Sequence, residues 1–87
     1  MTREAILTQL RELITLNFEI PADMVTPEAS WRGNLGMDSL DLVDMTFFIK
    51  RHFGVDEKAH AYRGLATVGD VVEFIHERVQ ANPEEEA

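Results

Sequence analysis

The first clear pattern in the chain is a stripe of apolar residues at helical spacing near the amino terminus. Its members, spaced i, i+4, i+7 and i+8, are Ile6, Leu10, Leu13 and Ile14. Charged residues fill other positions of the helical wheel, so the pattern predicts an amphipathic helix over residues 3–16. Thr2 can cap its start, and Glu4 suits the positive end of the helix dipole.

A long connection follows this helix, from Asn17 to Asp38. A long regular element is excluded there by two prolines and two glycines, which are Pro21, Pro27, Gly33 and Gly36. The connection also carries five large apolar residues, which are Phe18, Ile20, Val25, Trp31 and Leu35. We therefore expect it to pack over the core, and connections of this length are often functional.

A second helix is predicted from Asp38 or Ser39 to Phe53. Asp38 is a good N-cap, and Asp41 places a second carboxylate in the first turn. Gly54 is expected to end the helix, because glycine readily adopts the left-handed conformation common at that position.

The remaining sequence contains one weak and one strong helical pattern. A short helix is expected within residues 57–63, and a last helix at Thr67, which with Asp70 approaches a capping box. The apolar stripe of the last helix is Val68, Val71, Val72, Ile75 and Val79. The predicted fold is all-α: a small bundle of three main helices plus one short helix, with a long first connecting loop. Counting the short helix, this is a four-helix bundle. Residues 1–80 should form the domain and residues 81–87 a disordered acidic tail.

Two apolar stripes run along the second helix. One consists of Leu42, Met45, Ile49 and Phe53, and the other of Leu40, Val43 and Phe47. Both would be buried if the helix were simply central in the bundle. Alternatively, only the first stripe faces the core, and the second faces a partner, edged by Asp41 and Asp44.

Composition narrows the possible partners and compartments. A chain of 87 residues with 45% hydrophobic residues makes one small domain, too small for a deep cleft between lobes. Sixteen Asp and Glu against eight Lys and Arg give a net charge of −8, which disfavours nucleic acid and anionic membranes and favours basic docking patches. The absence of cysteine excludes disulfides and thiolate metal sites. Without a signal peptide or a membrane-length apolar run, we expect a cytoplasmic monomer that does not insert into membranes.

Ser39 stands where the long connection becomes the second helix. Its hydroxyl should be exposed there, and an attached anion would meet free backbone N–H groups at the positive helix end. That environment suits a phosphodiester. Ser39 could equally be an ordinary first-turn helix residue, a position that serine commonly occupies.

The sequence around Ser39 resembles the acyl carrier protein family. Residues 36–41 read GMDSLD, which contains the family's Asp-Ser-Leu motif with a preceding glycine and a following acid. Residues 67–75 read TVGDVVEFI and are similar to the family's final-helix motif. The resemblance spans about residues 3–80, with the serine near the middle of a small acidic chain.

This resemblance implies that Ser39 carries 4′-phosphopantetheine as a phosphodiester, which a phosphopantetheinyl transferase attaches from coenzyme A. The metal ion of that step is held mainly by the transferase, and no metal site is expected in this chain. The terminal thiol would carry acyl groups as thioesters for fatty-acid, polyketide or modified-lipid biosynthesis. Asp38 would present Ser39 to the transferase as well as cap the helix.

The resemblance also assigns a partner surface. Its apolar positions are matched by Leu40, Val43 and Phe47, and its acidic docking positions by Asp41 and Asp44. The implied partners are ketosynthase, acyltransferase or acyl-ligase enzymes with basic docking patches. However, residues 50–52 read KRH and residues 57–63 read EKAHAYR, where typical fatty-acid carriers are acidic. A dedicated carrier of a specialised pathway fits these departures better.

The chain is not expected to be an enzyme. His52 lies about three and a half helical turns from Ser39, roughly 20 Å away, and no Gly-x-Ser-x-Gly motif is present. One alternative is a helical adaptor that binds a partner through the second stripe without a prosthetic group. Another is an aminoacyl or peptidyl carrier of the peptide-synthetase type, although those more often have two glycines before the motif.

Overall fold

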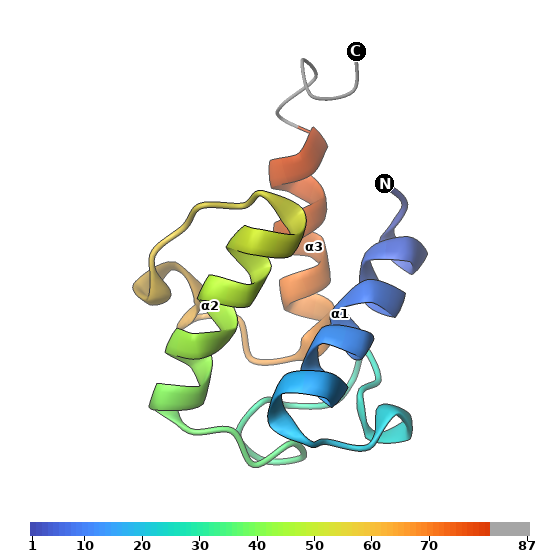
Figure 1. Cartoon of the computed structure of the whole chain (residues 1–87), viewed down its shortest axis with the longest axis vertical. Helices are drawn as coiled ribbons and strands as arrows, with labels where there is room; N and C mark the ends of the chain where they lie inside the picture. The colour runs from blue at the N-terminus through green and yellow to red at the C-terminus, as the bar shows by residue number, and fades with distance from the viewer. Residues whose placement is uncertain (81–87) are drawn as a thin grey trace.

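The computed structural model describes residues 1–80, and of Gln80 only the backbone. The α-helices are α1 (Arg3–Phe18), α2 (Ser39–Phe53) and α3 (Val68–Gln80), and the short 3-10 helices are η1 (Ala22–Met24) and η2 (Ala59–Tyr62). Helix α1 packs against both α3 and α2, and α2 also contacts η2 (Figure 1). The all-α prediction is confirmed. The prediction of a four-helix bundle is not confirmed, because the fourth predicted helix is only the single 3-10 turn η2. The predicted acidic tail, residues 81–87, lies outside the described residues.

The helix starts are fixed by the side chains that the sequence pattern indicated. Thr2 Oγ1 accepts a hydrogen bond from Ala5 N at 3.1 Å, which confirms the cap of α1. Thr67 and Asp70 each accept a bond from the other's backbone N–H, at 3.1 and 3.2 Å, so α3 begins with a capping box. Helix α1 extends two residues past the predicted end and stops at Glu19, whose φ of 58° is left-handed.

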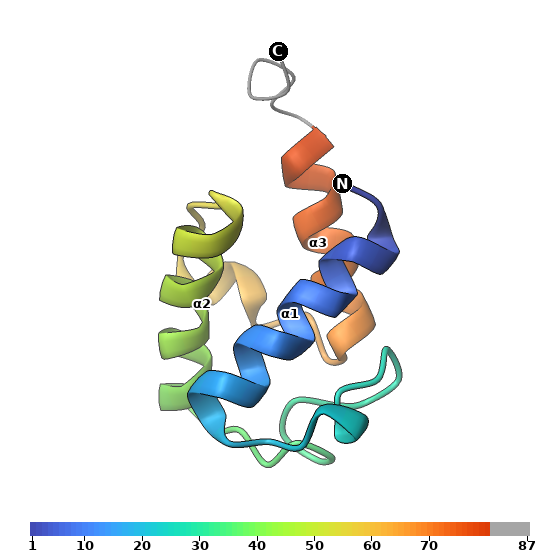
Figure 2. The same ribbon diagram turned by 45° about the vertical axis from the view of Figure 1, so that its right-hand side comes forward.

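The connection between α1 and α2 runs under the lower ends of the helices in both views (Figures 1 and 2). Its buried side chains include Ile20, Val25, Trp31 and Leu35, as predicted. Trp31 ties the connection to the start of α3: its indole Nε1 donates to the Thr67 carbonyl at 3.0 Å, and its backbone N donates to Ala66 O at 3.2 Å. The backbone N of Met37 in turn donates to Trp31 O at 2.8 Å, so the chain reaches α2 along a fixed path.

The core lies between the three α-helices and this connection. Its largest fully buried side chains are Ile6, Leu10, Ile14, Met45, Ile49, Ile75, Val25, Val68 and Val71. At the edge, the rings of Phe18 and Phe48 meet edge to face at 5.8 Å and join the end of α1 to α2. Among residues 1–80, no helix has the length and apolarity required to cross a bilayer.

Candidate functional site

The start of α2 is held by a complete capping box between two aspartates. Asp41 N donates to Asp38 Oδ1 at 3.0 Å, and Asp38 N donates to Asp41 Oδ2 at 3.1 Å. This confirms Asp38 as the N-cap and gives Asp41 a structural role beside the docking role that the resemblance assigned to it. Gly36, two residues earlier, has a φ of 67°, a left-handed conformation that glycine adopts without strain. The turn and the cap together fix where the helix begins.

Ser39 is the first residue of α2, and it is exposed. The first backbone N–H groups of a helix have no partner within it, so the hydroxyl stands at a positive end that attracts anions. The Ser39 Oγ also accepts a hydrogen bond from Arg32 Nη2 at 3.0 Å. The predicted position of Ser39 is therefore confirmed, but sequence reasoning missed its neighbour Arg32, which lies seven residues earlier in an irregular loop.

The second serine of the chain differs from Ser39 in its surroundings. Ser30 Oγ accepts hydrogen bonds from the backbone N–H groups of Gly33 and Asn34, at 3.1 and 3.0 Å, and lies 3.2 Å from Asn34 Oδ1. Its hydroxyl is thus committed to a turn of the connection. Of the two serines in the sequence, only Ser39 presents its hydroxyl at a helix start.

A groove of about 430 Å³ opens beside Ser39, between α2 and η2. Its lining residues are Arg32, Ser39, Leu42, Val43, Ala59 and Arg63. Two of the eight Lys and Arg residues of this acidic chain therefore border the same groove. The groove combines apolar side chains with positive charge next to an exposed hydroxyl.

The two apolar stripes of α2 face in different directions. In the stripe expected to be buried, Met45 and Ile49 are fully inaccessible, but Leu42 and Phe53 are only half-buried. In the other stripe, Leu40 is 74% exposed, and Val43 and Phe47 are also exposed. The interpretation that only one stripe faces the core is confirmed. Leu42 and Phe53 pack against the core without being fully buried, and Phe53 lies at the helix end with the His52 ring 4.8 Å away.

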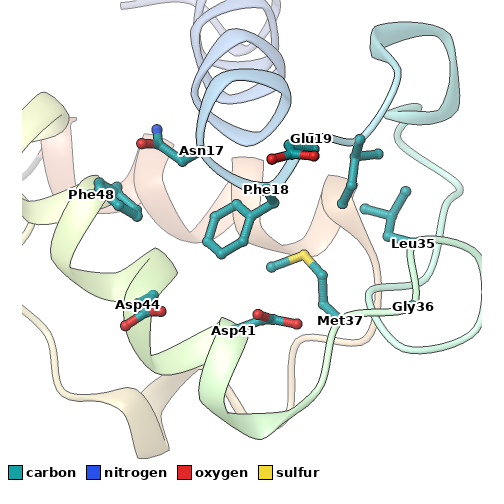
Figure 3. A pocket seen from close by; sticks show the side chains of 10 residues that line it. Asn17, Phe18, Glu19, Leu35, Gly36, Met37, Asp41, Asp44 and Phe48 are labelled. Carbon is teal, nitrogen blue, oxygen red and sulfur yellow. The ribbon is translucent and has the colours of Figure 1, made fainter.

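A shallow acidic pocket of about 340 Å³ lies between the end of α1 and the first half of α2. Figure 3 shows the Phe18 ring reaching into it from α1, with Met37 on one side and Phe48 on the other. Asp41 and Asp44 line it from α2. The two aspartates assigned to docking thus border a mixed apolar and acidic surface adjoining the exposed stripe.

The histidines do not form a metal site within residues 1–80. His52 Nε2 lies 2.6 Å from Gln9 Oε1 of α1, at the end of α2 opposite to Ser39. Over residues 1–80 there is no group of three His, Asp or Glu side chains placed to hold a metal ion. The chemistry available at Ser39 is that of an exposed hydroxyl beside a guanidinium at the amino end of a helix.

Comparison with known families agrees with this geometry. Residues 8–75 match the family model described as phosphopantetheine attachment site, which covers most of the chain. The protein belongs to this phosphopantetheine-binding family. Its members are carriers and not enzymes, and they hold a covalently attached 4′-phosphopantetheine group. They are modified by phosphopantetheinyl transferases and interact with biosynthetic enzymes, so the predicted carrier role and cofactor are confirmed.

Proposed function

We propose that this carrier is an acyl carrier protein whose 4′-phosphopantetheine is attached to Ser39. The observation that carries the proposal is the position of Ser39, exposed as the first residue of α2 within the sequence GMDSLD. The attached group would supply a thiol that holds acyl intermediates as thioesters. The chain itself contributes the position of the hydroxyl and the surface that partners recognise.

The surroundings of Ser39 fit a phosphodiester. The helix start supplies the positive end of the helix dipole, and the Arg32 guanidinium is already in contact with the Oγ atom. The capping box of Asp38 and Asp41 holds the helix start without using the hydroxyl of Ser39. Modification of that hydroxyl would therefore leave the cap intact.

The exposed stripe of α2 is the proposed docking surface. Leu40, Val43 and Phe47 are exposed, and Asp44 adds an exposed carboxylate beside them. Asp41 contributes through its partly exposed carboxylate, although one oxygen also serves the cap. Apolar anchors edged by negative charge fit the basic docking patch of a transferase, ketosynthase, acyltransferase or acyl-ligase.

The pathway is proposed from the charge distribution. Lys50, Arg51 and His52 make the last turn of α2 basic, whereas the resemblance implies acidic residues there in general fatty-acid carriers. We infer a dedicated cytoplasmic carrier for a specialised lipid or polyketide pathway. Its partners would read the acidic start of α2 and tolerate the basic end.

Co-expression with a broad-specificity phosphopantetheinyl transferase, followed by intact-mass measurement, tests the attachment. We expect the wild type and Ser30→Ala to gain the mass of one phosphopantetheine, and Ser39→Ala to gain none. Ser30→Ala is the matched control, because it removes the other serine hydroxyl of the chain. A modified Ser39→Ala protein would refute the assignment, and an unmodified wild type would favour an adaptor without a prosthetic group.

A further inference from the structure

The groove beside Ser39 carries positive charge that the fold does not otherwise use. Arg32 and Arg63 line it, and within residues 1–80 neither guanidinium forms an ion pair with a carboxylate. Sixteen acids are available in the chain for such pairs. Two cations left facing one groove in a protein of net charge −8 indicate that the groove receives an anion.

Arg32 is placed to reach any group attached to Ser39. Its Nη2 lies 3.0 Å from Ser39 Oγ, so an atom bonded to that oxygen would lie beside the guanidinium. Guanidinium groups recognise phosphate oxygens through paired, charge-assisted hydrogen bonds. The contact with the free hydroxyl is the weaker bond, because a hydroxyl carries no charge.

The backbone on either side of Arg32 is fixed, which lowers the entropic cost of holding an anion. Trp31 is buried and bonded to Thr67 and Ala66 at the start of α3. Gly33 N donates to Ser30 Oγ at 3.1 Å. Arg32 therefore extends from a rigid part of the connection toward α2.

Arg63 approaches the groove from a different element. It follows η2, and its backbone N donates to His60 O at 3.3 Å. Between the two arginines, the apolar part of the groove is formed by Leu42, Val43 and Ala59. This arrangement would suit a chain that begins with a phosphate and continues with less polar atoms.

We propose that Arg32, supported by Arg63, binds the phosphodiester on Ser39 and lays the first part of the arm in the groove between α2 and η2. The inference rests on the proposed attachment at Ser39. It assigns to Arg32 a positioning role beyond its hydrogen bond to the hydroxyl.

Phosphorus NMR of the loaded protein tests the contact without any enzyme assay. We expect the wild-type phosphodiester resonance to be shifted from its position in the urea-unfolded protein. In Arg32→Ala the resonance should move most of the way back to its position in the unfolded protein, and in Arg63→Ala it should move part of the way. In the control variant, Arg51→Ala, it should stay at the wild-type position. Arg51 is an exposed arginine about 18 Å along the same helix from Ser39. Arg32→Lys should keep a smaller shift, because it retains charge but loses the fork.

Two further measurements need only the wild type. Raising the salt shortens the screening length from about 30 Å to about 3 Å, and should move the phosphorus resonance toward the unfolded value. Amide resonances of Val43 and Ala59 should differ between the unloaded and loaded protein if the arm lies in the groove. Loaded protein with identical phosphorus resonances in wild type and Arg32→Ala, or with unchanged groove amides, would overturn the docked arm. The intact mass shows whether the group is attached, and so separates that result from failure of the attachment itself. If Arg32→Ala cannot be loaded, the two wild-type measurements still test whether the arm is docked.

Discussion

Asp38 and Asp41 exchange hydrogen bonds across the first turn of α2, each carboxylate accepting from the backbone N–H of the other at 3.0–3.1 Å. Ser39 lies between them and takes no part in this exchange. The structure that fixes the helix start is therefore separate from the hydroxyl proposed to be modified. This separation allows stability and modification to be changed independently.

Asp38→Ala should destabilise the protein, whereas Ser39→Ala should not. Loss of an N-cap costs about 1 kcal/mol, which in a domain of this size lowers the Tm by about 4–8 °C. Ser39→Ala should change the Tm by less than about 2 °C, because within residues 1–80 the Ser39 hydroxyl is bonded only to the exposed Arg32. Thermal unfolding followed by circular dichroism measures both values.

Asp38→Asn is the matched control, because an asparagine oxygen can still cap the helix. It should retain most of the stability that alanine loses. Equal losses in the asparagine and alanine variants would show that Asp38 acts mainly through its charge and not through the hydrogen bond.

Phe47→Ala and Ile49→Ala should separate docking from stability on the two faces of α2. Ile49 is 0% exposed, and its truncation should cost about 2–5 kcal/mol. Phe47 is 62% exposed, so its truncation should cost less than about 1 kcal/mol. Urea unfolding gives the two stabilities, and titration with a transferase gives the affinities.

The affinities should follow the reverse order. We expect Phe47→Ala to weaken transferase binding by about tenfold, the effect of losing about 1.4 kcal/mol from an apolar anchor. Asp44→Asn should slow association mainly at low salt. Unchanged binding of Phe47→Ala would remove the exposed stripe from the docking surface, whatever its effect on stability.

Periodicity and capping rules predicted the helices well, because both depend on residues close together in the sequence. Thr2, Asp38 and Thr67 were identified as caps, and each makes the expected bond. The exposed stripe of α2 also followed from spacing alone. The partial burial of Phe53 did not follow from spacing, because a helical wheel does not show where the neighbouring elements stop covering a helix.

The surroundings of Ser39 were harder to predict for a physical reason. Arg32 reaches Ser39 from a connection that Trp31 anchors to the start of α3, through a contact between residues 36 positions apart. Arg63 joins the same groove from η2, in a segment whose sequence gave only a weak helical pattern. No local periodicity encodes such meetings of exposed polar side chains from irregular segments.

Tyr62 should make the protein sensitive to high pH. Its side chain is 2% exposed, and burial, with a smaller effect of Glu57, raises its pKa from 10.0 to about 12. Since the folded protein keeps the phenol proton more firmly than the unfolded chain, this stabilisation is complete below pH 10 and is lost as the pH rises toward about 12. Tyr62 is the only tyrosine, so tyrosinate absorbance reads its titration directly.

Tyr62→Phe provides the comparison. The hydroxyl has no hydrogen-bond partner within the described part of the chain, so its removal should raise stability by about 1 kcal/mol at neutral pH. The variant should also lose the part of the alkaline destabilisation that depends on Tyr62. A less stable variant at neutral pH would mean that the hydroxyl makes a bond that stabilises the fold.

The basic end of α2 should set the choice of partner through Arg51. The basic residues could stabilise the helix end, or they could repel the basic patches of general fatty-acid enzymes. The contacts of the three residues differ, which allows the two explanations to be distinguished. Lys50 Nζ lies 3.6 Å from Asp56 Oδ1, and His52 contacts Gln9, so both have local structural roles. Arg51 forms no ion pair with any carboxylate of residues 1–80 and lines a surface pocket with Leu16 and Phe48.

Cations in the last turn of a helix contribute about 0.3–1 kcal/mol each, so Lys50→Glu and Arg51→Glu should both lower the Tm slightly. If the charge also repels the basic patches of general fatty-acid enzymes, Arg51→Glu should raise turnover of the loaded carrier by a general ketosynthase severalfold. That gain should fade as salt screens surface charges. Lys58→Glu is the control, because it makes the same charge change outside the helix. The charge would have no role in partner choice if the wild type, Arg51→Glu and Lys58→Glu showed equal turnover while only the helix variants lost a little Tm. Stabilisation of the helix end would then be a sufficient explanation.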